Sequence, residues 1–143
     1  MKPEHWTLDD IDWSAFRPDL VTPQFLAIAK AASVVEHNGK HYADYLYKVF
    51  PDDDELKEAI KYWALEEVQH GQALGKWAEM ADPNFDFATV FQEFAEAYQL
   101  PLDIDHSVRG SKTGELIARC IVETGTSSFY TAIADQCEEP VLT

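Results

Sequence analysis

The stretch Trp63-Ala64-Leu65-Glu66-Glu67-Val68-Gln69-His70 decides the fold of this 143-residue chain. Glu67 and His70 are three residues apart, which places them one turn apart on the same face of an α-helix. A carboxylate and an imidazole then lie on a face whose other residues are apolar. Because an unpaired buried charge costs several kcal/mol, such groups either satisfy one another through hydrogen bonds or bind a metal. The apolar residues of this face follow alternating steps of four and three, the spacing of a core-facing stripe: Leu56, Ile60, Trp63, Leu74, Trp77 and Ala81.

The segment before this stretch predicts one long helix from residue 22 to about residue 50. Thr22 is a good N-cap, Pro23 suits the first helical position, and Pro51 ends the helix. Glu36 interrupts the centre of its core-facing stripe. The small residues around it would leave room between helices, and Gly39 favours close packing or access to a site. The other residues of this stripe are Phe25, Ala29, Ala32, Gly39, Ala43, Leu46 and Phe50.

The second helix is predicted from Asp52, which resembles the start of a capping box with Glu55, to about Met80. Because the connection between the first two helices is short, we expect them to be antiparallel neighbours. Glu36 lies fifteen residues before Pro51, and Glu67 lies fourteen after Asp53. The two carboxylates are therefore predicted at nearly the same height in the helix pair.

Residues 81–112 predict a long connection that crosses from one end of a bundle to the other, with a short amphipathic helix between Phe85 and Tyr98. A third helix is predicted from Ser111 to about Gln136, with Glu115 in its first turn. Acidic residues followed by Pro140 resemble the start of a fourth helix. The predicted core-facing stripe of the third helix is Leu116, Cys120, Glu123, Ser127, Tyr130, Ala134 and Cys137.

Composition limits the class of protein. The length and a charged fraction of 26% are typical of one soluble globular domain, which we divide into an arm at 1–21 and a helical domain at 22–143. A formal net charge of −15 argues against nucleic acid and anionic membranes as partners. No apolar run has the length of a membrane span, and the N-terminus lacks a signal-peptide pattern. Cys120 and Cys137 are separated by roughly 25 Å of predicted helix, so we expect reduced thiols and a cytoplasmic location.

Three predicted helices each place one carboxylate at mid-length on the core-facing stripe: Glu36, Glu67 and Glu123. Three acids cannot all stay ionised in a core without compensating cations. Two divalent metal ions would provide that charge, and carboxylates with an imidazole suit iron or manganese. In this prediction Glu36 and Glu123 are terminal ligands, Glu67 bridges the two ions, and His70 completes the ligands of one ion.

This pattern resembles the ferritin-like di-iron carboxylate superfamily, which includes rubrerythrin-like proteins and ferritins. Glu66-Glu67-Val68-Gln69-His70-Gly71 is similar to its Glu-x-x-His helix, and Glu36 matches one single-Glu helix. Ile121 to Tyr130, which contains Glu123, is similar to the other single-Glu helix. The resemblance spans about residues 22–140 and implies an all-α, antiparallel helical bundle. It also implies two iron ions, or manganese, and redox chemistry with oxygen or peroxide.

The chain departs from that superfamily in one respect. The superfamily has a second Glu-x-x-His on a fourth helix, which would lie beyond residue 143. We therefore expect a bundle truncated before its last helix. Either the sequence is a fragment of a longer protein, or a homo-oligomer completes the bundle, for example by swapping. The expected function is a di-metal oxidoreductase. The alternatives are a non-catalytic metal-binding or structural protein with a degenerate site, and iron storage.

Other side chains are weaker candidates for the site. Tyr130 could hydrogen-bond a ligand or carry an oxidising equivalent, although a core tyrosine with a satisfied hydroxyl is the simpler interpretation. His37 and His41 could bind a metal as a pair, but they lie largely off the stripe. Glu66 could support the site from beside the stripe or serve as an alternative ligand, although a partly exposed helix acid is the simpler interpretation. The acids at 52–54 favour helix capping over calcium binding, because no EF-hand spacing follows them.

Overall fold

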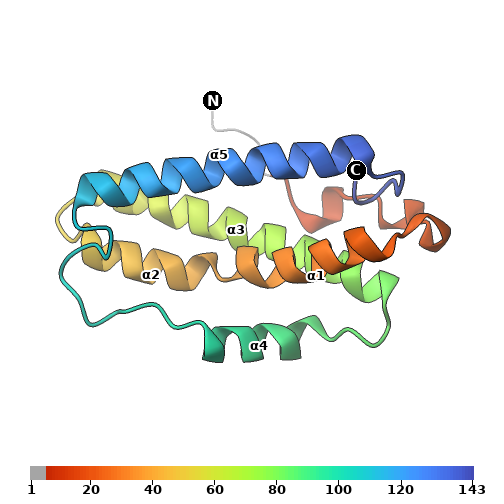
Figure 1. Cartoon of the computed structure of the whole chain (residues 1–143), viewed down its shortest axis with the longest axis horizontal. Helices are drawn as coiled ribbons and strands as arrows, with labels where there is room; N and C mark the ends of the chain where they lie inside the picture. The colour runs from red at the N-terminus through yellow and green to blue at the C-terminus, as the bar shows by residue number, and fades with distance from the viewer. Residues whose placement is uncertain (1–5) are drawn as a thin grey trace.

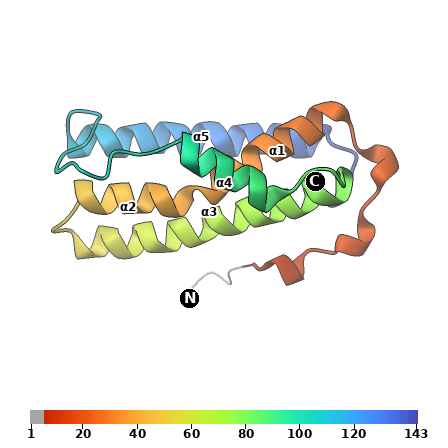
Figure 2. The ribbon, with the colours of Figure 1, turned by 90° about the horizontal axis from the view of Figure 1, so that it is seen from below.

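The computed structural model describes residues 6–143, and in this range the fold is all-α, with five α-helices and no strand (Figure 1). Helices α1 and α2 follow one another end to end, and α3 runs antiparallel to them. Helix α5 runs in the same direction as α3, while α4 lies outside the other helices, against α1 and α3 (Figure 2). No described helix is long and apolar enough to cross a membrane. The helices are α1 (Pro23–His37), α2 (Gly39–Val49), α3 (Asp54–Ala81), α4 (Phe87–Ala97) and α5 (Lys112–Gln136).

The prediction of one continuous helix over residues 22–50 is wrong, because the helix breaks at Asn38. The ψ angle of Asn38 is −1°, away from the helical value, and its side-chain oxygen bonds Nδ1 of His41 at 2.7 Å. Asn and Gly are weak helix formers, so residues 38 and 39 offer little resistance to a break. The N-cap is as predicted: the Thr22 hydroxyl accepts from the Phe25 N–H.

Helix α3 is the longest element and joins two hydrophobic clusters. Its N-cap is Asp53, not Asp52 as predicted, since the Asp53 carboxylate accepts from the Leu56 N–H at 2.9 Å. One cluster, between α2 and α3, includes Tyr45 and Ile60; the other, between α1 and α3, includes Ala29 and Trp77. Glu67 and His70 lie between these two clusters in sequence, so the polar site interrupts the apolar core at the middle of α3.

The described part of the N-terminal arm, residues 6–21, consists of three short 3-10 turns joined by extended chain. Its aromatic residues hold it against the helices. Trp13 and Phe16 pack on the cluster around Trp77, and the Lys76 ammonium lies 4.0 Å from the centre of the Trp13 ring. The Trp13 indole also donates to the carbonyl of Leu8 at 2.8 Å.

Helix α5 is rotated relative to the predicted stripe. Leu116, Cys120 and Ser127, predicted to face the core, are exposed, whereas Glu115 is fully buried. The Glu115 carboxylate accepts from the hydroxyls of Tyr42, Tyr45 and Ser107 at 2.8, 2.8 and 2.6 Å. The sequence interpretation of Glu115 as a first-turn acid missed this role. Three hydroxyl donors offset the cost of burying the carboxylate and fix the start of α5 against α2.

Residues 138–143 do not begin a fourth helix as the Glu138-Glu139-Pro140 pattern predicts; they form a turn. The reason is Glu139, which is fully buried. Its carboxylate accepts from the Trp77 indole at 2.7 Å and from the backbone N–H groups of Arg17, Val141 and Leu142. A carboxylate with four donors is stable in this position, and it ties the end of α5 to α3 and to the arm.

Candidate metal centre

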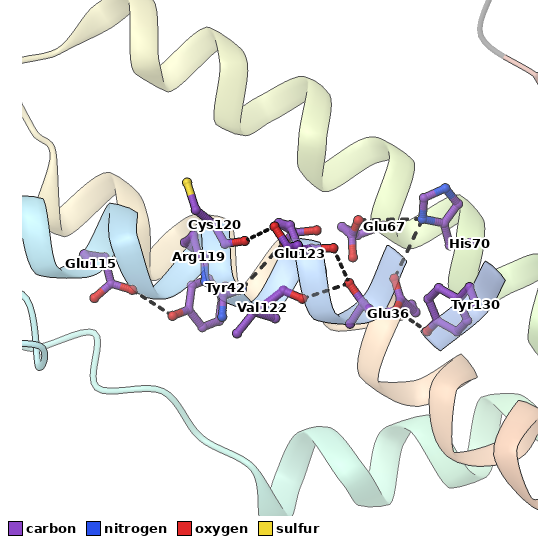
Figure 3. A network of polar contacts seen from close by, with 12 residues as sticks. Glu36, Tyr42, Glu67, His70, Glu115, Arg119, Cys120, Val122, Glu123 and Tyr130 are labelled. Atoms are coloured by element: carbon purple, nitrogen blue, oxygen red, sulfur yellow. Dashed lines mark hydrogen bonds and ion pairs between the residues drawn. The ribbon is translucent and has the colours of Figure 1, made fainter. Parts of the chain in front are cut away.

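Glu36 of α1 and both Glu67 and His70 of α3 converge at mid-bundle (Figure 3). One ligand atom of each lies within 4.8 Å of the others. His70 Nδ1 is 3.7 Å from a Glu36 oxygen and 3.6 Å from a Glu67 oxygen. Ligands at 2.0–2.2 Å from one ion are at most about 4.4 Å apart, so small side-chain rotations would bring all three atoms onto a single cation.

The site is enclosed on several sides. The side chains of Glu36 and Glu67 are 8% and 15% exposed, and that of His70 is 38% exposed. The Tyr130 hydroxyl donates a hydrogen bond to Glu36. The Trp6 ring stacks on His70 with centroids 5.8 Å apart, so this part of the arm covers the imidazole. Aromatic cover and burial lower the local dielectric, which strengthens the interaction of these carboxylates with any cation.

Glu36, Glu67 and His70 shift the pKa values of one another. Burial raises the pKa of Glu36, but His70, Glu67 and the Tyr130 hydroxyl outweigh it, and the net pKa is lowered. Burial, with the negative charges of Glu36 and Glu123, raises the pKa of Glu67 to about 7 despite the opposing effect of His70. Contacts with the Glu36 and Glu67 carboxylates raise the pKa of His70 to about 10, against the effect of burial. Without metal, an imidazolium therefore compensates Glu36 near neutral pH.

Two glycines allow α3 to approach the broken helix at the site. A Cβ built on Gly39 would lie 2.4 Å from the Cβ of Glu67. One built on Gly71 would lie 2.4 Å from the backbone nitrogen of His37. Both distances are too short for real atoms, so the absence of side chains at these two positions sets the spacing between α3 and the α1–α2 junction. Of the two roles predicted for Gly39, close packing and access to a site, this geometry supports close packing.

Glu123, the third predicted carboxylate, is not part of the cluster of three. Its side chain is 45% exposed and lies 3.9 Å from the Arg119 guanidinium. It does line, with Glu36, Glu67, His70 and Tyr130, a cavity of about 350 Å³. The four predicted ligand residues therefore line one cavity. Only Glu36, Glu67 and His70 bring their ligand atoms within 4.8 Å of one another. Whether these residues bind a metal stays a prediction.

The weaker candidates lie elsewhere. His37 Nδ1 bonds the carbonyl of Val68 at 3.1 Å, and its ring packs edge-on against Phe91. His41 bonds Asn38 and stacks on Phe91. Glu66 is not among the clustered ligands. In residues 6–143 no second group of three metal-ligating side chains converges as closely as Glu36, Glu67 and His70.

Sequence reasoning missed two residues at the site. Trp6 covers His70, and no periodic pattern could reveal a contact across sixty-four residues. Arg119 lies one turn before Glu123 on α5. The core-facing stripe predicted for this helix does not include Arg119. The sequence signal that identifies Arg119 is its spacing of four residues from Glu123, which places both side chains on the same face of a helix.

Comparisons with protein-family models, with curated proteins and with solved structures gave no match for this chain. The function is therefore argued from the residues and the geometry described above.

Proposed function

We propose that this chain is a non-haem di-metal carboxylate protein with a ferritin-like bundle, and that it binds iron and acts as an oxidoreductase with oxygen or peroxide. The observation that carries the proposal is the convergence of Glu36, Glu67 and His70 at the middle of two antiparallel helices. Two carboxylates and one imidazole are a suitable ligand set for iron or manganese. Iron held by such ligands supplies redox chemistry with oxygen species.

The residues of the site would divide their roles as follows. Glu36 and His70 hold one ion, and Glu67 lies between that position and the side facing Glu123. The Tyr130 hydroxyl holds one Glu36 oxygen, which leaves the other oxygen toward His70. Trp6 limits the access of water to the imidazole. Glu123 would reach a second ion by rotating away from Arg119, to which it is held by only a 3.9 Å ion pair.

A second ion would need further ligands, and we propose that an additional helix supplies them in a homo-oligomer. Supporting this, α3 and α5 carry exposed apolar side chains that a packed helix would cover. These residues are Tyr62 and Leu65 on α3 and Leu116, Ile117, Ile121 and Phe129 on α5. Size-exclusion chromatography with light scattering should give a species larger than the 16.2 kDa chain; a well-folded monomer at all concentrations would contradict this part of the proposal.

The metal proposal is tested by anaerobic titration with Fe(II), followed by exposure to oxygen. We expect about one to two irons per chain, a near-ultraviolet absorption band that develops with oxygen, and loss of both in Glu67→Ala. Glu66→Ala is the matched control, because it removes the adjacent glutamate of the same helix and should retain iron. Iron binding that is weak, or equal in the two variants, would refute the proposed centre.

The same measurements separate the alternative functions. A structural metal site would raise the melting temperature on metal binding without turnover of oxygen or peroxide. Iron storage would show many irons per chain and a shell-sized oligomer. The enzyme hypothesis predicts low stoichiometry and repeated turnover when a reductant is supplied.

A further inference from the structure

A second cavity, of about 450 Å³, lies beside the candidate metal centre, between α1, α3 and α5. We name it the apolar cavity. Most of its wall is apolar and comes from all three helices, for example from Phe25 and Ile28 of α1, Leu74 of α3 and Ile133 of α5. A cavity of this volume holds a small organic molecule. Because apolar walls offer water no hydrogen-bond partners, such cavities take up apolar molecules readily.

The apolar cavity meets the cavity of the metal centre. His70, Tyr130 and Thr131 line both of them. Figure 3 shows His70 and Tyr130 beside Glu36 at one end of the site, away from Glu123. The apolar cavity begins at this end of the site, so a molecule inside it lies next to His70.

The lining of the apolar cavity favours an uncharged ligand. Within residues 6–143, no lysine, arginine, aspartate or glutamate lines it, although these four residue types make up 26% of the chain. Its hydroxyl groups already donate within the chain: Tyr130 donates to Glu36, and Thr131 and Thr143 donate to backbone carbonyls. Burying a charge without a partner is strongly unfavourable. The wall therefore selects against anions and cations.

Ndelta1 of His70 is directed elsewhere. It lies 3.7 Å from a Glu36 oxygen and 3.6 Å from a Glu67 oxygen, on the side of the metal centre. The Trp6 ring stacks on the imidazole. The only imidazole in the lining therefore serves the carboxylates and not a charged group of a ligand.

Two segments outside the helices border the apolar cavity. Trp6 of the arm and Leu142 of the C-terminal turn both line it, and Figure 1 shows the arm and the turn at the same end of the bundle. Buried Glu139 holds both segments, because its carboxylate accepts from the N–H groups of Arg17 and Leu142 at 2.9 Å each. An α-helix is about 10 Å wide with its side chains, so one turn, about 5.4 Å long, already fills roughly 420 Å³. The cavity therefore fits a small molecule and not a helix of another chain.

We propose that the apolar cavity binds a small, uncharged, apolar organic molecule as the organic substrate of the metal centre. The body of this molecule packs against the apolar walls of α1, α3 and α5, and one end lies against His70. Its binding depends only on the cavity. Its role as substrate rests on the proposed function.

The binding test is fluorescence titration of the full chain with N-phenylnaphthylamine and, separately, with anilinonaphthalene sulfonate, which has the same rings and an added sulfonate. We expect the uncharged probe to bind about tenfold more tightly or better. Ala32→Phe on α1 and Ala134→Phe on α5 each place a ring in the cavity and should weaken the uncharged probe about tenfold or more. Ala31→Phe and Ala132→Phe are the matched controls, because both alanines are exposed and neither lines the cavity. They should bind the probe as the wild type does.

The location test uses the wild-type chain and therefore does not depend on the folding of any variant. Mn(II) bound at the metal centre should broaden the proton resonances of the bound uncharged probe, because the two cavities share His70, Tyr130 and Thr131. Mn(II) that binds without broadening these resonances places the probe elsewhere and overturns the proposal.

The remaining outcomes also decide. Binding that both cavity variants weaken and both controls retain supports the proposal. Equal binding of the two probes, or equal binding of the uncharged probe by Ala134→Phe and Ala132→Phe, overturns it. If Mn(II) does not bind, the proposed metal function fails, and the comparison of variants still decides whether the cavity is a binding site.

Discussion

The first residue of α2, Gly39, lies directly against Glu67 of α3, and no side chain fits between them. A Cβ on Gly39 would lie 2.4 Å from the Glu67 Cβ and 3.1 Å from its Cγ. The break between α1 and α2 therefore occurs where α3 passes too close to leave room for a side chain. The position of the Glu67 carboxylate depends on this approach.

We predict that Gly39→Ala separates the two helices locally, lowers the free energy of unfolding by about 1–3 kcal/mol and weakens metal binding. Gly125→Ala is the matched control, because nothing lies within 4 Å of a Cβ at that helical position. It should leave metal binding intact and stabilise the chain by up to about 1 kcal/mol. Urea denaturation and Mn(II) titration measure both effects; equal behaviour of the two variants would contradict the packing argument.

Tyr130→Phe removes the hydroxyl that donates to Glu36 and keeps the ring. A hydrogen bond to a charged group contributes about 1.5–3 kcal/mol, so the metal-free protein should lose stability on this scale. The pKa of Glu36 should rise, since the hydroxyl helps to lower it. Denaturation at pH 7 and at pH 5 tests this. The exposed Tyr98→Phe is the control, and a neutral effect of Tyr130→Phe would show that Tyr130 does not support the carboxylate.

Metal binding should release protons. In the metal-free site the pKa of His70 is about 10 and that of Glu67 about 7, so at pH 7 the imidazole is protonated and Glu67 is about half protonated. A metal ion needs both groups deprotonated. We expect between about one and two protons released per ion and an affinity that rises from pH 6 to pH 8. Calorimetry in two buffers of different ionisation enthalpy counts the protons; heats independent of the buffer would exclude this protonation scheme.

Glu115 should make the fold sensitive to acid. Burial raises its pKa, but hydrogen bonds from Ser107, Tyr45 and Tyr42 outweigh burial, and the net pKa is lowered. A lowered pKa in the folded state contributes stability that is fully present above the unfolded value and is lost as pH falls through the folded value. Glu115→Gln should therefore cost about 1–3 kcal/mol at pH 7, and the difference from wild type should shrink as the pH falls below the ordinary pKa of a glutamate, about 4.3. Glu55→Gln, exposed on α3, is the control.

The sequence by itself determined most of the helices and the relative height of Glu36 and Glu67. Apolar spacing, Thr22 with Pro23, and Ser111 predicted the start of α1 and the extents of α3, α4 and α5 closely, because these signals act within one or two turns. The short connection at residues 51–53 was enough to bring Glu36 level with Glu67, since rise per residue in a helix is constant. The position of His70 beside Glu67 followed from their spacing of three residues, which places the two side chains one turn apart on a helix.

Tertiary contacts decided the rest. Three features depend on partners more than twenty residues away. The break at Asn38 depends on the contact of Gly39 with Glu67. The rotation of α5 depends on the hydrogen bonds of Glu115 with Tyr42 and Tyr45, and the turn at Glu139 depends on its hydrogen bond with Trp77. A buried acid with several donors outweighs a local helix signal, because an unsatisfied charge costs more than helix propensity contributes. Local pattern carries no information about such partners, so the orientation of Glu123 beside Arg119 emerged only from the packed helices.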